Sequence, residues 1–120
     1  MMLTHHGGDL NFDQCRARQA VVTACRPQPG FPVSTQWSFE VAPSTEWRIP
    51  NPDLVFLPTA FVDVSGCLER KLEALDTYHA EIPVLPDTYS RRAFEAPARW
   101  RNSTVGVEAG EAVVVQGVLT

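Results

Sequence analysis

The sequence lacks several features that would assign the protein to a class at once. No stretch approaches the roughly 20 consecutive apolar residues that a membrane-spanning helix needs. The first residues carry neither the basic start nor the apolar run of a secretory signal peptide. The three cysteines show no Cys-x-x-Cys spacing, and any disulfide scheme leaves one of them unpaired. We therefore expect a cytoplasmic protein with no membrane partner.

Positive charge is also scarce. The chain has 10 basic and 14 acidic residues, and the resulting net charge of −4 gives no general attraction for nucleic acid. The arginines between Arg91 and Arg101 form short clusters of the kind found on solvated helix faces. We therefore expect no nucleic-acid partner. At 120 residues and 44% hydrophobic composition, the chain is long and apolar enough for one globular domain over residues 1–120.

The stretch richest in chemical groups is residues 4–14, THHGGDLNFDQ. It combines two histidines, two glycines and two aspartates in one loop, and an apolar-periodic segment follows it directly. Imidazole and carboxylate groups ligate zinc and transfer protons, and a helix start offers free backbone N–H groups. The pattern indicates a functional site. A polar surface turn that ends in a helix N-cap is the alternative interpretation.

The periodicity of the chain predicts alternating strands and helices. Residues 1–4 are too few to classify by periodicity. Asn11 or Asp13 is expected to cap a helix over residues 13–26, whose small side chains should face a sheet; these are Ala17, Ala20, Val21 and Ala24. Residues 36–41 alternate as a half-buried strand with Trp37 and Phe39 on the inner side.

The second half of the chain continues the alternation. Residues 54–57 are predicted to form a short buried strand. Asp63 or Ser65 is expected to cap a helix over residues 65–82, with a stripe made by Leu68, Leu72, Leu75 and His79. Ser90 should cap a helix to Trp100 that Pro97 ends or kinks, and Asn102 should be its C-cap. Residues 113–119 are predicted to be the last strand, interrupted by Gly117.

The loop THHGGDLNFDQ, followed by RARQAVVTACRPQPG, resembles the second conserved block of the PIG-L (LmbE-like) deacetylases. The likeness continues in order through residues 39–47, 61–75 and 98–112. The family consists of zinc-dependent hydrolases that remove the acetyl group from N-acetylated amino-sugar conjugates. The resemblance implies an α/β fold, a Rossmann-like (LmbE-like) three-layer sheet domain, with the loop at the carboxyl end of a parallel strand.

The sequence departs from the family at the positions that bind metal. The family has an earlier His-Pro-Asp-Asp block that supplies two zinc ligands and the catalytic base, and the sequence contains no such run. Gln14 stands where the family has its third ligand, a histidine, and Asp87 also replaces a common histidine. We therefore expect a single partial domain, the C-terminal portion of a deacetylase with its N-terminal strands missing. A truncated gene, a misplaced start and a split protein remain open as its origin.

The resemblance assigns roles to individual residues. Asp13 matches the aspartate that orients the catalytic group, and Asn11 is placed to donate a hydrogen bond to the substrate carbonyl. Glu46 and His6 are expected to line the substrate pocket, although Glu46 is equally consistent with a loop acid beside a packed Trp47. An amide oxygen at Gln14 is a weak zinc ligand. His5 or His6, with Asp9 and Asp13, would be a weak substitute, so we expect poor Zn²⁺ binding.

Two functions therefore follow from the sequence. The first is a zinc-dependent deacetylase for N-acetylated amino-sugar conjugates, inactive as this chain alone. The second is a non-catalytic remnant that binds a sugar conjugate or a partner protein. Loss of central strands would expose apolar helix faces, so we also expect a homo-oligomer or a complementary N-terminal half.

Overall fold

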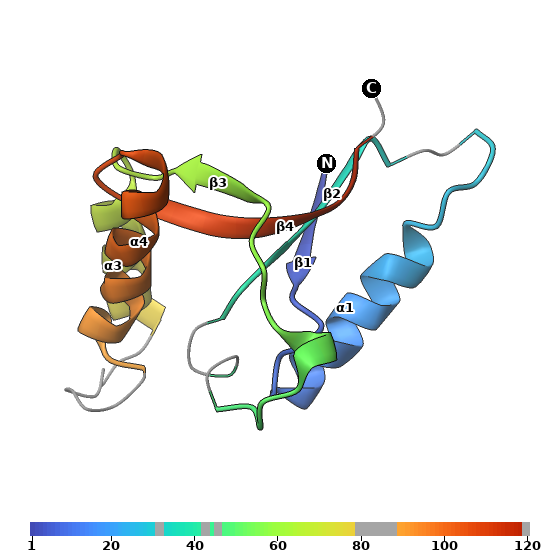
Figure 1. Cartoon of the computed structure of the whole chain (residues 1–120), viewed down its shortest axis with the longest axis horizontal. Coiled ribbons are helices and arrows are strands. Elements are labelled where there is room, and N and C mark those ends of the chain that lie inside the picture. The colour runs from blue at the N-terminus through green and yellow to red at the C-terminus, as the bar shows by residue number, and fades with distance from the viewer. Residues whose placement is uncertain (31–32, 42–43, 45–46, 79–88, 119–120) are drawn as a thin grey trace. The chain divides into compact units, whose positions relative to one another are not determined.

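The computed structural model describes residues 1–30, 33–41, 44, 47–78 and 89–118 (Figure 1). Over these residues the chain is an α/β protein with a four-stranded mixed sheet and three α-helices. The strands are hydrogen-bonded in the order β1-β2-β4-β3. The chain divides into two compact units: an N-terminal unit, Met1–Ala60 with Val113–Thr120, and a helical unit, Phe61–Ala112. The α/β class agrees with the sequence prediction.

The N-terminal unit begins with strand β1 (Met2–His5), which pairs in parallel with β2 (Thr35–Phe39). The crossover between them contains helix α1 (Phe12–Ala24), which packs beside β1. Parallel strands need a crossover of this kind, and its first loop lies at the carboxyl end of β1. The structure therefore confirms the expected strand and the expected position of the loop at its end.

The other neighbour of β2 is the long strand β4 (Gly110–Val118), which runs antiparallel to it. Gln36 is opposite Gly117 and Trp37 is opposite Val115, so Gln116 is the extra residue of a β-bulge. The predicted last strand is thus confirmed, but it begins earlier and continues through Gly117.

Helix α1 forms where it was predicted but presents a different face. Asn11 is the N-cap, and its side chain accepts hydrogen bonds from the backbone N–H groups of Asp13 and Gln14 at 2.9 and 3.2 Å. No residue of α1 is fully buried. The inner side is instead half-buried and largely polar, consisting of Gln14, Cys15, Arg18 and Val21, whereas Ala17, Ala20 and Ala24 are exposed. Polar contacts to the loop, not small side chains against a sheet, decide which face of α1 turns inward.

The predicted burial in β2 is only partly right. Trp37 and Phe39 are half-buried, and the most buried residue of the strand is Ser38. Ser38 lies opposite Thr4 in the parallel register. The hydroxyl groups of both are buried without a hydrogen-bond partner in the described part of the chain, which makes this pair a weak point of the sheet.

The predicted strand over residues 54–57 is wrong. Pro52–Leu54 forms a 3₁₀ turn, η1, because the Asn51 side chain accepts the Asp53 N–H at 3.0 Å and a proline favours the first helical position. Phe56 is buried after it, but Val55 and Leu57 are exposed.

The helical unit contains β3 (Ala60–Asp63), α3 (Leu68–Tyr78), α4 (Arg91–Val105) and the start of β4. Its core consists of Leu68, Leu72, Ala98 and Ala109, with Val64 and Phe94 packed against it. The predicted leucine stripe is therefore confirmed for Leu68 and Leu72. His79 and Asp87, which carried two sequence predictions, lie outside the described residues.

Asp63 and Ser65 form a turn before α3. The Asp63 carboxylate accepts hydrogen bonds from the hydroxyl and the backbone N–H of Ser65, and these bonds lower the pKa of Asp63. The Ser65 hydroxyl in turn accepts from the N–H groups of Glu108 and Ala109. The two residues predicted as alternative caps of the helix are thus bonded to each other and to the start of β4 instead.

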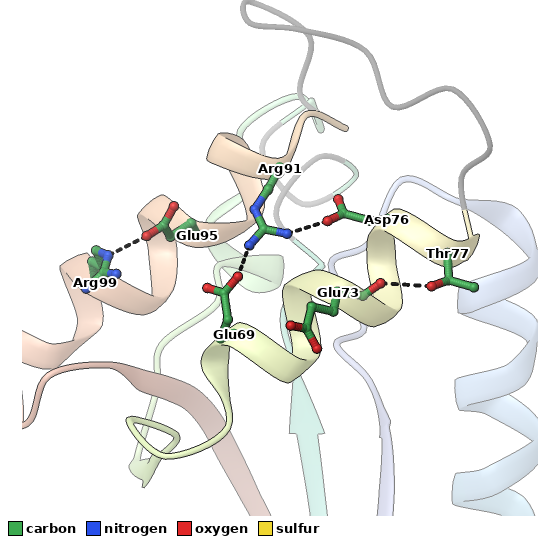
Figure 2. Close-up of polar contacts among 7 residues, drawn as sticks. All are labelled: Glu69, Glu73, Asp76, Thr77, Arg91, Glu95 and Arg99. Atoms are coloured by element: carbon green, nitrogen blue, oxygen red, sulfur yellow. Dashed lines mark hydrogen bonds and ion pairs between the residues drawn. The ribbon is translucent and has the colours of Figure 1, made fainter.

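Helices α3 and α4 lie side by side, and ion pairs link them (Figure 2). The Arg91 guanidinium contacts the carboxylates of Glu69 and Asp76, which are both on α3. Glu95 and Arg99 form a further pair along α4. Exposed pairs of this kind stabilise a fold by only about 0–1 kcal/mol each, so the leucine and alanine core provides most of the stability.

Helix α4 contains Pro97, as predicted, but it ends later than predicted and Asn102 is not its C-cap. It is capped by Ser90 as expected, but it passes through Pro97 without ending and continues to Val105. Gly106, with a φ of 73°, is the C-cap, and its N–H donates to the Asn102 carbonyl. Phe94 and Ala98 bury one face of the helix on both sides of Pro97, which offsets the hydrogen bond lost at the proline.

Replacing Pro97 by alanine should stabilise the helical unit. The substitution supplies the missing N–H in a continuous helix, and we expect the free energy of unfolding to rise by about 1–3 kcal/mol. Urea unfolding followed by circular dichroism measures the change, with the exposed Arg92→Ala in the same helix as a control expected within about 0.5 kcal/mol of the parent. An unchanged or lower value for Pro97→Ala would show that the fold uses the proline.

Candidate functional site

The candidate site is the loop that connects β1 to α1, in the N-terminal unit. The His6 N–H donates to the Phe39 carbonyl at 2.9 Å and extends the parallel pairing by one bond. The chain then turns, with the Asp9 N–H donating to the His6 carbonyl at 3.3 Å. The Leu10 N–H donates to the Ser44 carbonyl at 3.1 Å, which fixes the loop to the segment after β2.

Close approach explains both glycines of this loop. A Cβ atom on Gly8 would lie 2.1 Å from the Leu54 carbonyl oxygen, a distance that no side chain tolerates. A Cβ on Gly7 would lie 3.0 Å from Cζ of Arg18, whose guanidinium lies against the Gly7 backbone. At position 8 the loop needs glycine because a backbone carbonyl lies too close for any side chain. At position 7 the close neighbour is the Arg18 side chain, which can move.

We expect Gly8→Ala to destabilise the N-terminal unit by about 2–4 kcal/mol, because backbone must move to admit the methyl group. Gly7→Ala should cost less than half of that, since Arg18 can shift. Gly117→Ala is the matched control: nothing lies within 4 Å of a Cβ there, and it should be close to neutral. Thermal unfolding of the three variants checks this order, and equal losses at positions 7 and 8 would contradict it.

The Asp9 side chain is the anchor of the loop. It is only 1% exposed. Its Oδ1 accepts the Asn11 N–H at 2.7 Å, and its Oδ2 accepts the Ser44 hydroxyl at 2.9 Å. Its backbone carbonyl accepts hydrogen bonds from Arg48 Nη1 at 2.7 Å and from the Cys15 thiol at 3.1 Å. Buried carboxylates need such donors, and here they come from the N-cap of α1 and from the segment after β2.

The Gln14 side chain completes the shell around Asp9. Its amide faces both carboxylate oxygens of Asp9, so the nitrogen must point toward them, because two oxygens would repel. In this orientation the nitrogen donates to both oxygens, at 3.0 Å for Oδ1, and to the Ser44 hydroxyl at 3.3 Å. The residue predicted at the family's metal-ligand position is therefore turned toward a buried carboxylate.

We expect Gln14→Leu to lower the free energy of unfolding by about 1–3 kcal/mol, because a buried carboxylate loses a donor. Gln19→Leu, an exposed glutamine on the same helix, should change it by less than about 0.5 kcal/mol. Urea titration measures both. Equal effects of the two substitutions would mean that the contact between Gln14 and Asp9 contributes nothing.

The two histidines point to different neighbours. The His5 ring lies 4.9 Å from the Phe39 ring, and the His6 ring meets the Phe56 ring edge-on at 5.1 Å. His6 Nε2 is 3.1 Å from the Leu54 carbonyl oxygen. Because a carbonyl only accepts, Nε2 carries the proton in this contact. Of the His6 ring nitrogens, only Nδ1 is then available to a substrate or a metal.

The remaining predicted site residues are separated from this shell. Asp13 is exposed in the first turn of α1. The Asn11 side-chain oxygen is used as the helix cap, a structural role. Glu46, predicted to line a substrate pocket, lies outside the described residues.

The described residues do not by themselves fit a zinc ion. Nowhere in the described ranges do three histidine, cysteine, aspartate or glutamate side chains lie close enough to hold a metal. Gln14 is directed to Asp9, and His6 uses Nε2 on a carbonyl. A zinc site at this loop would therefore need ligands from elsewhere, because Gln14 offers at most its weakly ligating amide oxygen.

Beside the loop lies a cavity of about 550 Å³ that the sequence did not indicate. Its walls come from the start of α1 and from residues 48–52, and Arg48 is its charged side chain apart from the buried Asp9. Arg48 and Ser44 reach Asp9 from 39 and 35 residues away, so no local pattern could have identified them.

Comparison with known proteins does not assign the chain to a family. The chain matches no protein-family model, and a search of curated proteins found no significant match. Within the described residues, no helix is both long and apolar enough to cross a membrane.

Proposed function

We propose that this chain supplies the second-block part of a PIG-L-like, zinc-dependent deacetylase that acts on N-acetylated amino-sugar conjugates. The observation that supports the proposal is the position of the loop. Residues 6–11 lie at the carboxyl end of a parallel strand and immediately before a helix N-terminus, which is where α/β proteins of the Rossmann-like type bind ligands. The Rossmann-like identity of the sheet is part of the same proposal.

Under this proposal the chain's own residues position the substrate. Asp13 is exposed at the first turn of α1 and is free to orient a neighbouring group, and His6 offers Nδ1 from the loop. In the family, zinc supplies an activated water molecule and polarises the acetyl carbonyl. Because the described residues do not fit a zinc ion, activity requires a His-Pro-Asp-Asp block from another segment or chain.

One observation favours a second candidate, a non-catalytic module that binds a sugar conjugate. The Gln14 amide nitrogen faces Asp9 and Ser44, so this side chain makes a structural contact that needs no metal. A site that has exchanged a ligand for a structural hydrogen bond suits recognition better than hydrolysis. The two candidates differ in whether a supplied first block restores hydrolysis.

The test extends the chain at its N-terminus with a His-Pro-Asp-Asp segment from a PIG-L deacetylase. We expect weak zinc binding with Gln14, and Gln14→His should tighten it at least about tenfold, because imidazole is a better zinc ligand than an amide oxygen. Calorimetry measures the binding. Acetate release from an N-acetylglucosamine conjugate should appear only in the histidine form.

Two controls make the result specific. Gln19→His places a histidine on the same helix outside the loop and should leave zinc binding unchanged. Asp13→Asn in the extended Gln14→His protein should reduce acetate release while the protein remains folded. Tight binding of one zinc ion by the original chain would instead show that His5 or His6 is a ligand. Zinc binding without acetate release would favour the binding module.

A further inference from the structure

The cavity beside the loop is a second candidate site, which shares Asp9, Leu10 and Phe12 with the loop and adds residues 48–52. Its volume of about 550 Å³ is within the roughly 300–1,000 Å³ typical of small-molecule sites. It belongs entirely to the N-terminal unit. Its walls combine one guanidinium with several apolar side chains; the lining residues on which the argument rests are Leu10, Phe12, Arg48, Ile49 and Pro50.

Arg48 is held in place and still has donors to offer. Its Nη1 donates to the Asp9 carbonyl at 2.7 Å, which fixes the guanidinium at the cavity wall. Across the residues that the structure describes, its other N–H groups meet no acceptor and it forms no ion pair. A guanidinium with free donors recognises a carboxylate or phosphate group.

Among the described residues that line the cavity, no other charge competes for this guanidinium. Asp9 also lines the cavity, but its carboxylate is buried and already accepts from Asn11, Ser44 and Gln14. A second guanidinium, that of Arg16, lies 4.7 Å from the centre of the Phe12 ring. The two guanidinium groups favour an anion over a cation.

The apolar part of the cavity is unusually open to solvent. Ile49 is 85% exposed, Phe12 67% and Leu10 53%. Large apolar side chains gathered around one cavity lose contact with water when an apolar ligand enters, and this stabilises the complex. They come from two segments of the chain, residues 10–12 and residues 49–50.

We propose that this cavity binds an organic anion that carries an aryl or alkyl group. The anionic group pairs with Arg48, and the apolar group lies against Leu10, Phe12 and Ile49. This proposal goes beyond deacetylation, because it requires neither a metal ion nor hydrolysis, and it stands or falls separately from the proposed function.

Saturation-transfer NMR titrations with 4-phenylbutyrate and with the neutral 4-phenylbutanol test the proposal on the intact chain. The acid should bind at least about tenfold more tightly than the alcohol, since a charge-assisted hydrogen bond is worth more than a neutral one. Arg48→Gln should remove this preference. Arg92→Gln, an exposed arginine outside the cavity, should leave it unchanged.

A second pair of variants tests the apolar part without touching the Arg48 contact. Ile49→Ser should weaken binding of the acid and of the alcohol several-fold, whereas Leu57→Ser, also apolar and exposed but outside the cavity, should not. The proposal is overturned if neither probe binds, if acid and alcohol bind equally to the original chain, or if both serine variants weaken binding alike. These outcomes remain decisive even if Arg48→Gln does not fold.

Discussion

The buried carboxylate of Asp9 is the interaction on which the N-terminal unit depends. Removing an ionised carboxylate from water is costly unless donors surround it. Here the donors come from the backbone of Asn11, from the hydroxyl of Ser44 and from the amide of Gln14. One side chain thus joins the loop after β1, the first turn of α1 and the segment after β2. Gly7 and Gly8 serve the same loop. The Arg18 side chain lies close to Gly7 and the Leu54 carbonyl close to Gly8, so larger residues would push the loop away from its position around Asp9.

This dependence limits what the loop can do chemically. The Gln14 amide donates to Asp9 through its nitrogen, so only its oxygen, a weak zinc ligand, is left for a metal. A histidine at position 14 could donate one ring N–H to Asp9 and ligate a metal through its other nitrogen, but it would bring a single donor where glutamine brings two. Glutamine at this position therefore favours the hydrogen bonds around Asp9 over metal affinity.

The sequence predicts the elements of this protein better than their contacts. Hydrophobic periodicity and capping residues located α1, α3 and α4. The caps Asn11 and Ser90 could be recognised because each bonds to backbone N–H groups no more than three residues away. The inner face of α1 was missed, because it is decided by Asp9 and by Gly7, whose neighbours are visible only in the folded chain. The strand expected over residues 54–57 failed because Asn51 and Pro52 favour a 3₁₀ turn. Arg48 and its cavity were not predictable at all, since their contacts span 39 residues.

The two faces of the loop have separate roles in this fold. Toward the interior, the groups that make the sequence resemble a metal site are used for hydrogen bonds: Gln14 on Asp9, and His6 on the Leu54 carbonyl. Toward solvent, the carbonyl of the same Asp9 fixes Arg48 at the wall of an open cavity with polar and apolar sides. The Asp9 carboxylate is hydrogen-bonded in the interior, while the Asp9 carbonyl holds the Arg48 guanidinium at the surface. The negative charge of Asp9 is therefore buried where the positive charge of Arg48 is accessible. Ligand recognition at Arg48 therefore depends on the hydrogen bonds that hold Asp9 in place. It does not depend on metal binding by the loop.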